Sequence, residues 1–177
     1  TYVGELGWEL HIPTEFAVGV YEAVMAAGAG HGIANAGYRA IETLRLEKGY
    51  RAWGSDIGPD HTPLEAGLGW AVKLKSAIPF QGLKKILATF TVDDPSVVLL
   101  GRETILRDGK PAGWLSSGGF GHTIGKPIGL GYVRDPAGLD RAALLASTYE
   151  LEVATERVPC RVHLEPLYDP AMERVKG

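Results

Sequence analysis

The sequence is poor in cysteine and has no long apolar run. Its one cysteine, Cys160, has no second thiol in the chain with which to form a disulfide. The neighbours Val158, Pro159 and Val162 are typical of a strand, so we expect a buried and unreactive thiol. No apolar run approaches the roughly 20 residues that a membrane-spanning helix needs. The sequence therefore predicts neither a disulfide-stabilised scaffold nor a membrane partner.

Positive charge and metal-binding clusters are also scarce. The 18 Lys and Arg residues are scattered and are outnumbered by 21 Asp and Glu, which gives a net charge of -3. The chain lacks the basic stripe that a nucleic-acid backbone requires, so no nucleic-acid partner is expected. The five histidines share no spacing, and we expect no metal site. Phosphate-binding loops, dinucleotide fingerprints and nucleophile elbows are missing, so no residue is assigned a catalytic role.

The chain is long enough and apolar enough to bury a core. It has 177 residues, of which 45% are hydrophobic, enough for one ordinary domain or two small ones. It begins with Thr1, without an initiator methionine, and its first residues already have the pattern of a turn and a strand. We therefore expect a piece of a longer protein that makes intramolecular contacts with further N-terminal domains.

Residues 1–82 carry the patterns of both strand and helix. Apolar and polar residues alternate over Trp8–Ile12, which predicts a half-buried strand with Glu9 pointing away from the core. Apolar residues at helical spacing predict helices near 15–27 and 38–48, each followed by glycine. Glu42 and Arg45 lie three positions apart and can pair on the surface of the second helix.

Residues 96–177 have the pattern of a small antiparallel barrel or sandwich, after a linker over 83–95. Gly, Asp and Pro turns separate short apolar runs at regular spacing. The runs are Val97–Leu100, Trp114–Leu115, Ile128–Val133, Tyr149–Val153 and Val158–Leu164. Arg107–Lys110 predicts a tight turn, because Gly109 accepts positive φ. Gly118–His122 is glycine-dense but no helix follows it to bind phosphate, so we expect a flexible hairpin loop.

Four stretches resemble, in order, the motifs of the aminomethyltransferase (glycine-cleavage T-protein) family. Tyr2–Glu9 is similar to the segment Y-T-G-E-x-G followed by an aromatic residue and E, and Glu42–Tyr50 to D-x-L-R-L-E. Thr62–Trp70 is similar to T-P-L-E-A-G-L-G with a final aromatic residue, and Phe80–Gly82 to the F-x-G after it. Ser116–Val133 resembles the T-S-G and I-A-L segments of the C-terminal barrel.

The resemblance covers nearly the whole chain and implies its fold class. It implies an α+β protein, with part of an α/β folate-binding domain over 1–82, a linker over 83–95 and a small antiparallel β-barrel over 96–177. Leu46–Gly54 resembles the corresponding segment of dimethylglycine and sarcosine dehydrogenases, because Lys48 and Trp53 are usually lacking in stand-alone T-proteins. Ile41 stands where T-proteins commonly carry an arginine near the folate. Both features favour the dehydrogenase branch.

The resemblance also implies a set of folate-binding residues. Tyr2 and Glu9 fall on the positions that contact the pterin, where a carboxylate can accept two hydrogen bonds from adjacent N–H groups and a tyrosine can add its ring face. Tyr50 matches an aromatic position of the folate cavity, and Arg51 could reach the glutamyl or aminobenzoyl part. The alternatives are a solvated carboxylate for Glu9, a core side chain for Tyr50, and an arginine lying along apolar surface for Arg51.

The implied function is one-carbon transfer to tetrahydrofolate within a flavin-dependent dimethylglycine or sarcosine dehydrogenase-like enzyme. The partner would be the small-molecule folate, with FAD in another part of the parent protein and with the family's reacting-site aspartate upstream of Thr1. We therefore expect an incomplete catalytic unit with weak folate binding in isolation. A stand-alone aminomethyltransferase and a non-catalytic relative, similar to the regulatory subunit of pyruvate dehydrogenase phosphatase, are the alternatives. The expected compartment is the bacterial cytoplasm or the mitochondrial matrix.

Overall fold

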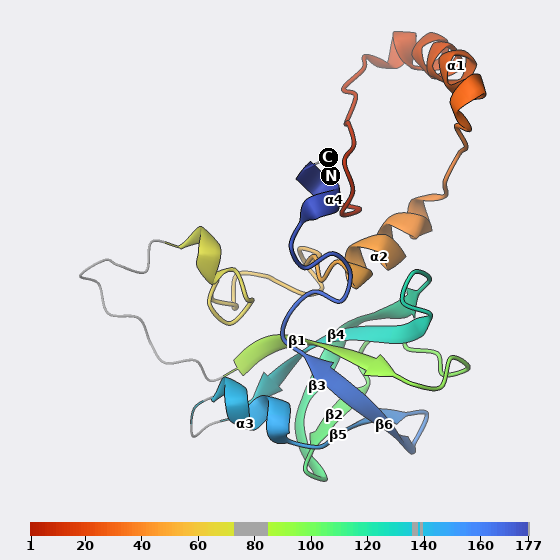
Figure 1. Cartoon of the computed structure of the whole chain (residues 1–177). Helices are drawn as coiled ribbons and strands as arrows, with labels where there is room; N and C mark the ends of the chain where they lie inside the picture. The colour runs from red at the N-terminus through yellow and green to blue at the C-terminus, as the bar shows by residue number, and fades with distance from the viewer. Residues whose placement is uncertain (73–84, 136–137, 139, 177) are drawn as a thin grey trace.

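The computed structural model describes residues 1–72, 85–135, 138 and 140–176. Figure 1 shows a β-barrel, with helix α2 (Tyr38–Glu47) lying beside it and a long N-terminal segment looping away from it. The expected motif Phe80–Gly82 lies outside the described residues. Within the described part of the chain, no helix combines the length and the apolar character that crossing a membrane demands.

Six antiparallel strands close into the barrel in the order β1-β4-β3-β2-β5-β6. The strands are β1 (Lys85–Val92), β2 (Thr104–Arg107), β3 (Lys110–Gly121), β4 (Lys126–Arg134), β5 (Tyr149–Val153) and β6 (Glu156–His163). The expected fold class, a mixture of helices and a small antiparallel barrel, is confirmed. Strand β1, however, falls inside the segment 83–95 that the sequence analysis assigned to a linker. The division into two domains stays a prediction.

The barrel interior explains why residues 85–92 form a strand. Ile86, Ala88 and Phe90 alternate along β1 and all belong to the barrel core, with Phe90 fully buried. Leu87 lies on the opposite face of β1 and packs in a second buried cluster, with Leu46 of α2. Thr89 and Thr91 share the face of Leu87 and are also buried, so β1 is buried on both faces.

The turn predicted at Arg107–Lys110 is confirmed. Asp108 and Gly109 have φ of 50° and 75°, and they join β2 to β3. Two successive positive φ values are the signature of a tight hairpin whose twist matches that of the strands.

The loop predicted at Gly118–His122 is wrong, because β3 continues to Gly121. The glycines serve close packing: a Cβ at Gly118 would lie 2.7 Å from the backbone of Leu99, and one at Gly121 would lie 2.9 Å from Oε1 of Glu47. Val97–Leu100 was also expected to be a strand and is not one, although Leu99 is buried against the barrel core.

Both helices predicted in the N-terminal part are present. The first is the 3-10 turn Thr14–Phe16 followed by α1 (Ala17–Gly28), and the second is α2. The strand predicted at Trp8–Ile12 is wrong, because no described segment pairs with it and Trp8 is 87% exposed. The remaining helical segments are the 3-10 turns Ala29–His31 and Gly69–Ala71 and the short helices α3 (Arg141–Ala146) and α4 (Glu173–Lys176).

Candidate functional site

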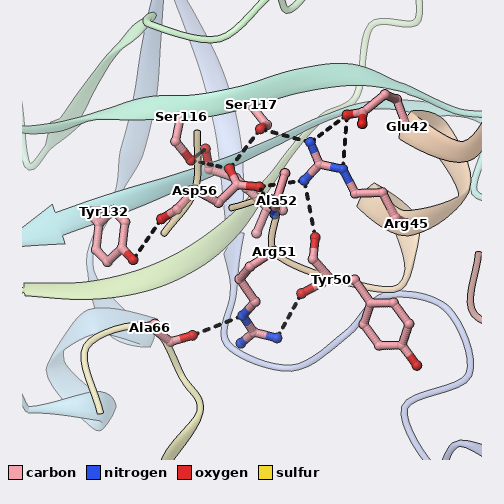
Figure 2. Close-up of polar contacts among 12 residues, drawn as sticks. Glu42, Arg45, Tyr50, Arg51, Ala52, Asp56, Ala66, Ser116, Ser117 and Tyr132 are labelled. Atoms are coloured by element: carbon pink, nitrogen blue, oxygen red, sulfur yellow. Dashed lines mark hydrogen bonds and ion pairs between the residues drawn. The ribbon is translucent and has the colours of Figure 1, made fainter. Parts of the chain in front are cut away.

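Arg45, in the last turn of α2, fixes this helix to the barrel. Its guanidinium is buried and donates hydrogen bonds to Asp56 (2.5 Å), Ser117 (3.0 Å), Glu42 (2.7 Å) and the carbonyl of Tyr50 (3.1 Å). Figure 2 shows these acceptors gathered around the one side chain. The predicted Glu42–Arg45 pair therefore exists, but Arg45 is not on the surface. Burial lowers the pKa of Arg45, and Glu42 and Asp56 more than offset that, so the net pKa is raised.

Asp56 is the second centre of this network. Its carboxylate accepts hydrogen bonds from the hydroxyls of Ser116 (2.5 Å) and Ser117 (2.7 Å) on β3 and from the backbone N–H of Ala52 (2.9 Å). The hydroxyl of Tyr132, on β4, donates to the backbone carbonyl of Asp56 at 2.9 Å. Burial, followed by the negative charge of Asp56, raises the pKa of Tyr132. The loop after α2 is thus held on the outer face of the barrel.

Glu47 and Lys48, also at the end of α2, hold two further segments. The Glu47 carboxylate accepts the backbone N–H groups of Thr123 (2.6 Å) and Ile124 (3.1 Å), in the turn between β3 and β4. Lys48 is fully buried and forms an ion pair with Asp169, which lowers the pKa of that carboxyl. The Leu46–Gly54 motif is therefore first a structural junction between helix, barrel and C-terminal tail.

The C-terminal tail, residues 165–176, lies against the first turn of the chain. The backbone N–H of Leu6 donates to the carbonyl of Arg174 (3.0 Å), and the hydroxyl of Tyr168 donates to Glu5 (2.5 Å), which raises the pKa of Tyr168. Figure 1 accordingly shows the two chain ends side by side, next to α4. Residues that are almost the whole chain apart in sequence therefore meet beside the end of α2.

A cavity of about 630 Å³ lies where these segments meet. Tyr2 and Tyr50 stack in its wall, with ring centroids 6.1 Å apart and an interplanar angle of 23°. Met172, from the tail, accepts a hydrogen bond from the Tyr50 hydroxyl through its sulfur at 3.6 Å. The other lining residues are Lys48, Arg51, Ile57, Gly67, Leu68, Trp70, Ile86, Leu87, Arg141, Leu164, Glu165, Pro166 and Pro170. The lining is thus mainly apolar and aromatic, with a few charged groups.

Arg51 lines the cavity but is already held by the backbone. Its side chain donates to the carbonyls of Ala66 (2.9 Å), Gly49 (2.8 Å) and Gly67 (3.4 Å). Burial lowers the pKa of Arg51. Since three of the five guanidinium N–H groups are engaged in this way, Arg51 fixes the cavity wall formed by residues 66–67.

Glu9 is the one predicted folate residue that the structure places elsewhere. Tyr2, Tyr50 and Arg51 all line the cavity, whereas Glu9 does not and its side chain is exposed. The chain leaves the first turn at Gly7 and runs outward to α1 (Figure 1), which carries Glu9 away from the cavity. The folate-binding role of all four residues stays a prediction.

Several residues of the cavity were not predicted from the sequence. Lys48 and Trp70 were part of the quoted motifs but were given no place in a site, and Met172 was not singled out. The charged pair Arg141 and Glu165 at the cavity was also missed, because 24 residues separate the two side chains in the chain. Among the described residues, no group of three or more metal-binding side chains is present.

Comparison with known proteins identifies the family. Residues 1–76 match the model of the GCVT N-terminal domain, and residues 85–169 match the glycine cleavage T-protein C-terminal barrel domain. Over 96% of the chain, the fold is similar to the crystal structure of the glycine cleavage system aminomethyltransferase T from Bartonella henselae, with a TM-score of 0.78, 23% identity and 48% of that chain covered. The chain belongs to the glycine-cleavage T-protein (aminomethyltransferase) family.

Two curated relatives place the chain near the dehydrogenase branch. It is 45% identical to mitochondrial sarcosine dehydrogenase of Homo sapiens, over 100% of the chain and 21% of that protein. It is 36% identical to mitochondrial dimethylglycine dehydrogenase of Mus musculus, over 99% of the chain and 21% of that protein. The chain therefore spans about a fifth of the length of these relatives. The expected resemblance to the family, and to the type found in these dehydrogenases, is confirmed.

Proposed function

We propose that the cavity binds tetrahydrofolate and that the chain is the one-carbon transfer region of a sarcosine or dimethylglycine dehydrogenase-like enzyme. The observation that carries the proposal is the convergence of Tyr2, Tyr50 and Arg51 on one cavity. The similarity to the two dehydrogenases supports it. Both of these relatives are mitochondrial by name, and we propose the mitochondrial matrix for a eukaryotic source or the cytoplasm for a bacterial one.

The chemistry of the cavity fits a reduced folate. Its volume of about 630 Å³ lies within the range of roughly 300–1,000 Å³ that is usual for small-molecule sites. A pterin is flat and aromatic, and the stacked rings of Tyr2 and Tyr50 with the indole of Trp70 offer faces for it. The glutamyl end is anionic, and Lys48, Arg51 and Arg141 are the cations in the lining. The cavity therefore offers aromatic rings for the pterin and cations for the glutamyl end.

The proposed work of these residues is binding, orientation and exclusion of water. Tetrahydrofolate supplies the nitrogen that accepts the carbon, and a flavin in another part of the parent protein oxidises the N-methyl amine. Holding the folate in a mainly apolar cavity keeps the acceptor in place and limits the release of free formaldehyde to water. None of the four predicted site residues is required to carry out acid-base chemistry.

The test is calorimetry with 5-formyltetrahydrofolate, a stable reduced folate, on the full natural protein that carries this chain. Tyr50→Ala removes a stacked ring from the cavity, and we expect the dissociation constant to rise by about tenfold, which corresponds to about 1.4 kcal/mol. Tyr21→Ala is the matched control, because Tyr21 lies on α1 outside the cavity and its hydroxyl accepts a hydrogen bond from Asn35. Equal affinity of the wild type and Tyr50→Ala would reject the cavity as the folate site.

The same assay tests Glu9. If residues 7–13 bring Glu9 to the pterin when folate binds, Glu9→Gln should weaken binding by about 1.5–3 kcal/mol, the usual contribution of a hydrogen bond to a charged group. Unchanged affinity would remove Glu9 from the site. If the wild-type protein binds no folate at all, the non-catalytic relative becomes the better assignment. Flavin reduction by the amine, measured in parallel, should be unaffected in every variant.

A further inference from the structure

The three cations in the cavity lining differ in how freely they can meet a ligand. Lys48 is fully buried and its ammonium donates to both the carboxylate and the carbonyl of Asp169. Arg51 donates to three backbone carbonyls. Neither group can turn to a ligand without leaving a buried polar partner unsatisfied, which is costly. Only Arg141, of the cations in the described lining, is held by an exposed partner.

The partner of Arg141 is Glu165, and both side chains lie in contact with solvent, which makes their ion pair weak. Nη2 of Arg141 donates to Oε1 of Glu165 at 2.8 Å, while the two side chains are 58% and 76% exposed. Ion pairs with such exposure contribute little, because water and salt screen them and both long side chains lose freedom. A carboxylate brought in by a bound ligand can therefore replace Glu165 on Arg141 with little net cost.

We infer that Arg141 receives the glutamyl carboxylates of the folate and that Glu165 competes with them for the guanidinium. The inference rests on the proposed function, since it assigns the anionic end of the same ligand. Because both residues are exposed, this part of the cavity opens to water, where a γ-linked glutamyl chain of any length can continue. Each added glutamyl residue carries one more carboxylate. The pair thus sets the preference for folates with long glutamyl chains.

The two partners should act in opposite directions on that preference. Replacing Arg141 removes the cation that attracts the chain. Replacing Glu165 removes a competing carboxylate and its repulsion, and leaves Arg141 free. A purely structural role for the pair would move both variants in the same direction, because each variant breaks the same ion pair. The sign of the change therefore separates the two interpretations.

The experiment measures dissociation constants of the mono- and pentaglutamyl forms of 5-formyltetrahydrofolate on the full natural protein. In the wild type we expect tighter binding of the pentaglutamate. In Arg141→Gln this preference should fall by about three- to tenfold, the size expected of an exposed charge pair strengthened by several carboxylates. In Glu165→Gln it should rise by about two- to fivefold. Arg141→Lys, which keeps the charge, should retain most of the preference.

Arg157→Gln is the matched control. Arg157 lies on β6, forms a partly exposed ion pair with Glu150 at 3.9 Å and does not line the cavity, so its loss should leave the preference unchanged. An unchanged preference in Arg141→Gln, or a fall in Glu165→Gln, would overturn the inference while leaving folate binding intact. No binding of either folate by the wild type would overturn the proposed function itself, so the two failures are distinguishable.

Discussion

The barrel and the segment Glu5–Leu44 differ in burial, although both were predicted from the same helix and strand patterns. Every strand of the barrel from β1 to β5 contributes a residue that is at most 5% exposed, and α2 adds Arg45 and Leu46 at 2% each. No residue between Glu5 and Leu44 is buried. Helix α1 is present although none of its side chains is buried. Local periodicity therefore specifies where a helix forms, while burial depends on what packs against it.

The comparison also separates two kinds of apolar side chain. In the barrel, apolar residues from distant strands close on one another and exclude water, which stabilises the fold. In the N-terminal segment, Trp8, Val18 and Tyr21 are each more than half exposed. Changes in the two regions should therefore have effects of very different size, and four measurements test this difference.

The largest contrast is expected in thiol chemistry. Burial, followed by the charge of Glu150, raises the pKa of Cys160 from 9.0 to about 12. The raised pKa lowers the thiolate fraction at pH 8 by about a thousandfold, and the thiolate is the reactive form. In Val18→Cys, which adds an exposed thiol on α1, we expect one thiol to react quickly with an alkylating reagent and Cys160 to react about a thousandfold more slowly.

Mass spectrometry of the alkylated peptides measures the two rates. Between pH 7 and pH 9 the rate at Cys160 should rise with pH, because the thiolate fraction grows about tenfold for each pH unit below the pKa. Unfolding in denaturant should abolish the difference between the two thiols. Comparable rates in the folded protein would show that the surroundings of Cys160 do not disfavour its thiolate.

The next effect is on stability, through Asp56. Asp56→Ala leaves the buried guanidinium of Arg45 with only the half-exposed Glu42 as an ion-pair partner, and it removes the carboxylate that accepts from Ser116 and Ser117. We expect a loss of about 3–5 kcal/mol in the free energy of unfolding, the usual cost of breaking a buried pair from one side. Asp60→Ala is the control, since Asp60 is exposed. Urea denaturation followed by circular dichroism measures both, and equal losses would contradict the central role of Asp56.

A smaller loss is expected from filling the space at Gly121. In Gly121→Ala the new Cβ would lie 2.9 Å from Oε1 of Glu47 and still closer to Ile128. We expect about 1–3 kcal/mol of destabilisation from overpacking, read from the urea midpoint. Gly19→Ala, in α1, meets nothing within 4 Å, so it should be neutral or stabilise α1 by up to about 1 kcal/mol. The comparison fails if the two variants have the same midpoint.

The smallest effect is expected at Leu10. This side chain is 63% exposed, and it lies in the stretch where the sequence analysis predicted a half-buried strand. Leu10→Ser should change the free energy of unfolding by no more than about 0.5 kcal/mol, as for most exposed positions. Leu115→Ala, in the barrel core, should cost about 2–5 kcal/mol in the same denaturation experiment. A large loss of stability in Leu10→Ser would show that Leu10 is buried, as the predicted half-buried strand requires.

The sequence predicted what is local and failed where the partner is distant. The helix at 38–48 and the turn at Asp108–Gly109 follow from helical spacing and from glycine, so both are confirmed. The burial of Arg45 could not be predicted, because its partner Ser117 lies 72 residues away and no pattern joins the two. Strand β1 was missed although Thr89 and Thr91 alternate with apolar neighbours; its pairing partners, β4 and β6, lie far along the chain.

The candidate site shows the same limit. Tyr2, Tyr50 and Arg51 came from the motifs that resemble the family, and the structure brings them to one cavity. Glu9 came from the same motif as Tyr2, but the chain turns away after Gly7, a change of direction that motif spacing does not reveal. Arg141 and Glu165 belong to no shared motif, and only the folded tail places them together.

The cavity is lined by residues from both ends of this sequence, so it can form only late in synthesis on the ribosome. Tyr2 emerges first among the lining residues and Met172 last, and at about 5–20 residues per second the interval is roughly ten to thirty seconds. The strands of the barrel are all synthesised within that interval, before the tail exists. Any ligand of this cavity can therefore be enclosed only after translation has passed residue 172.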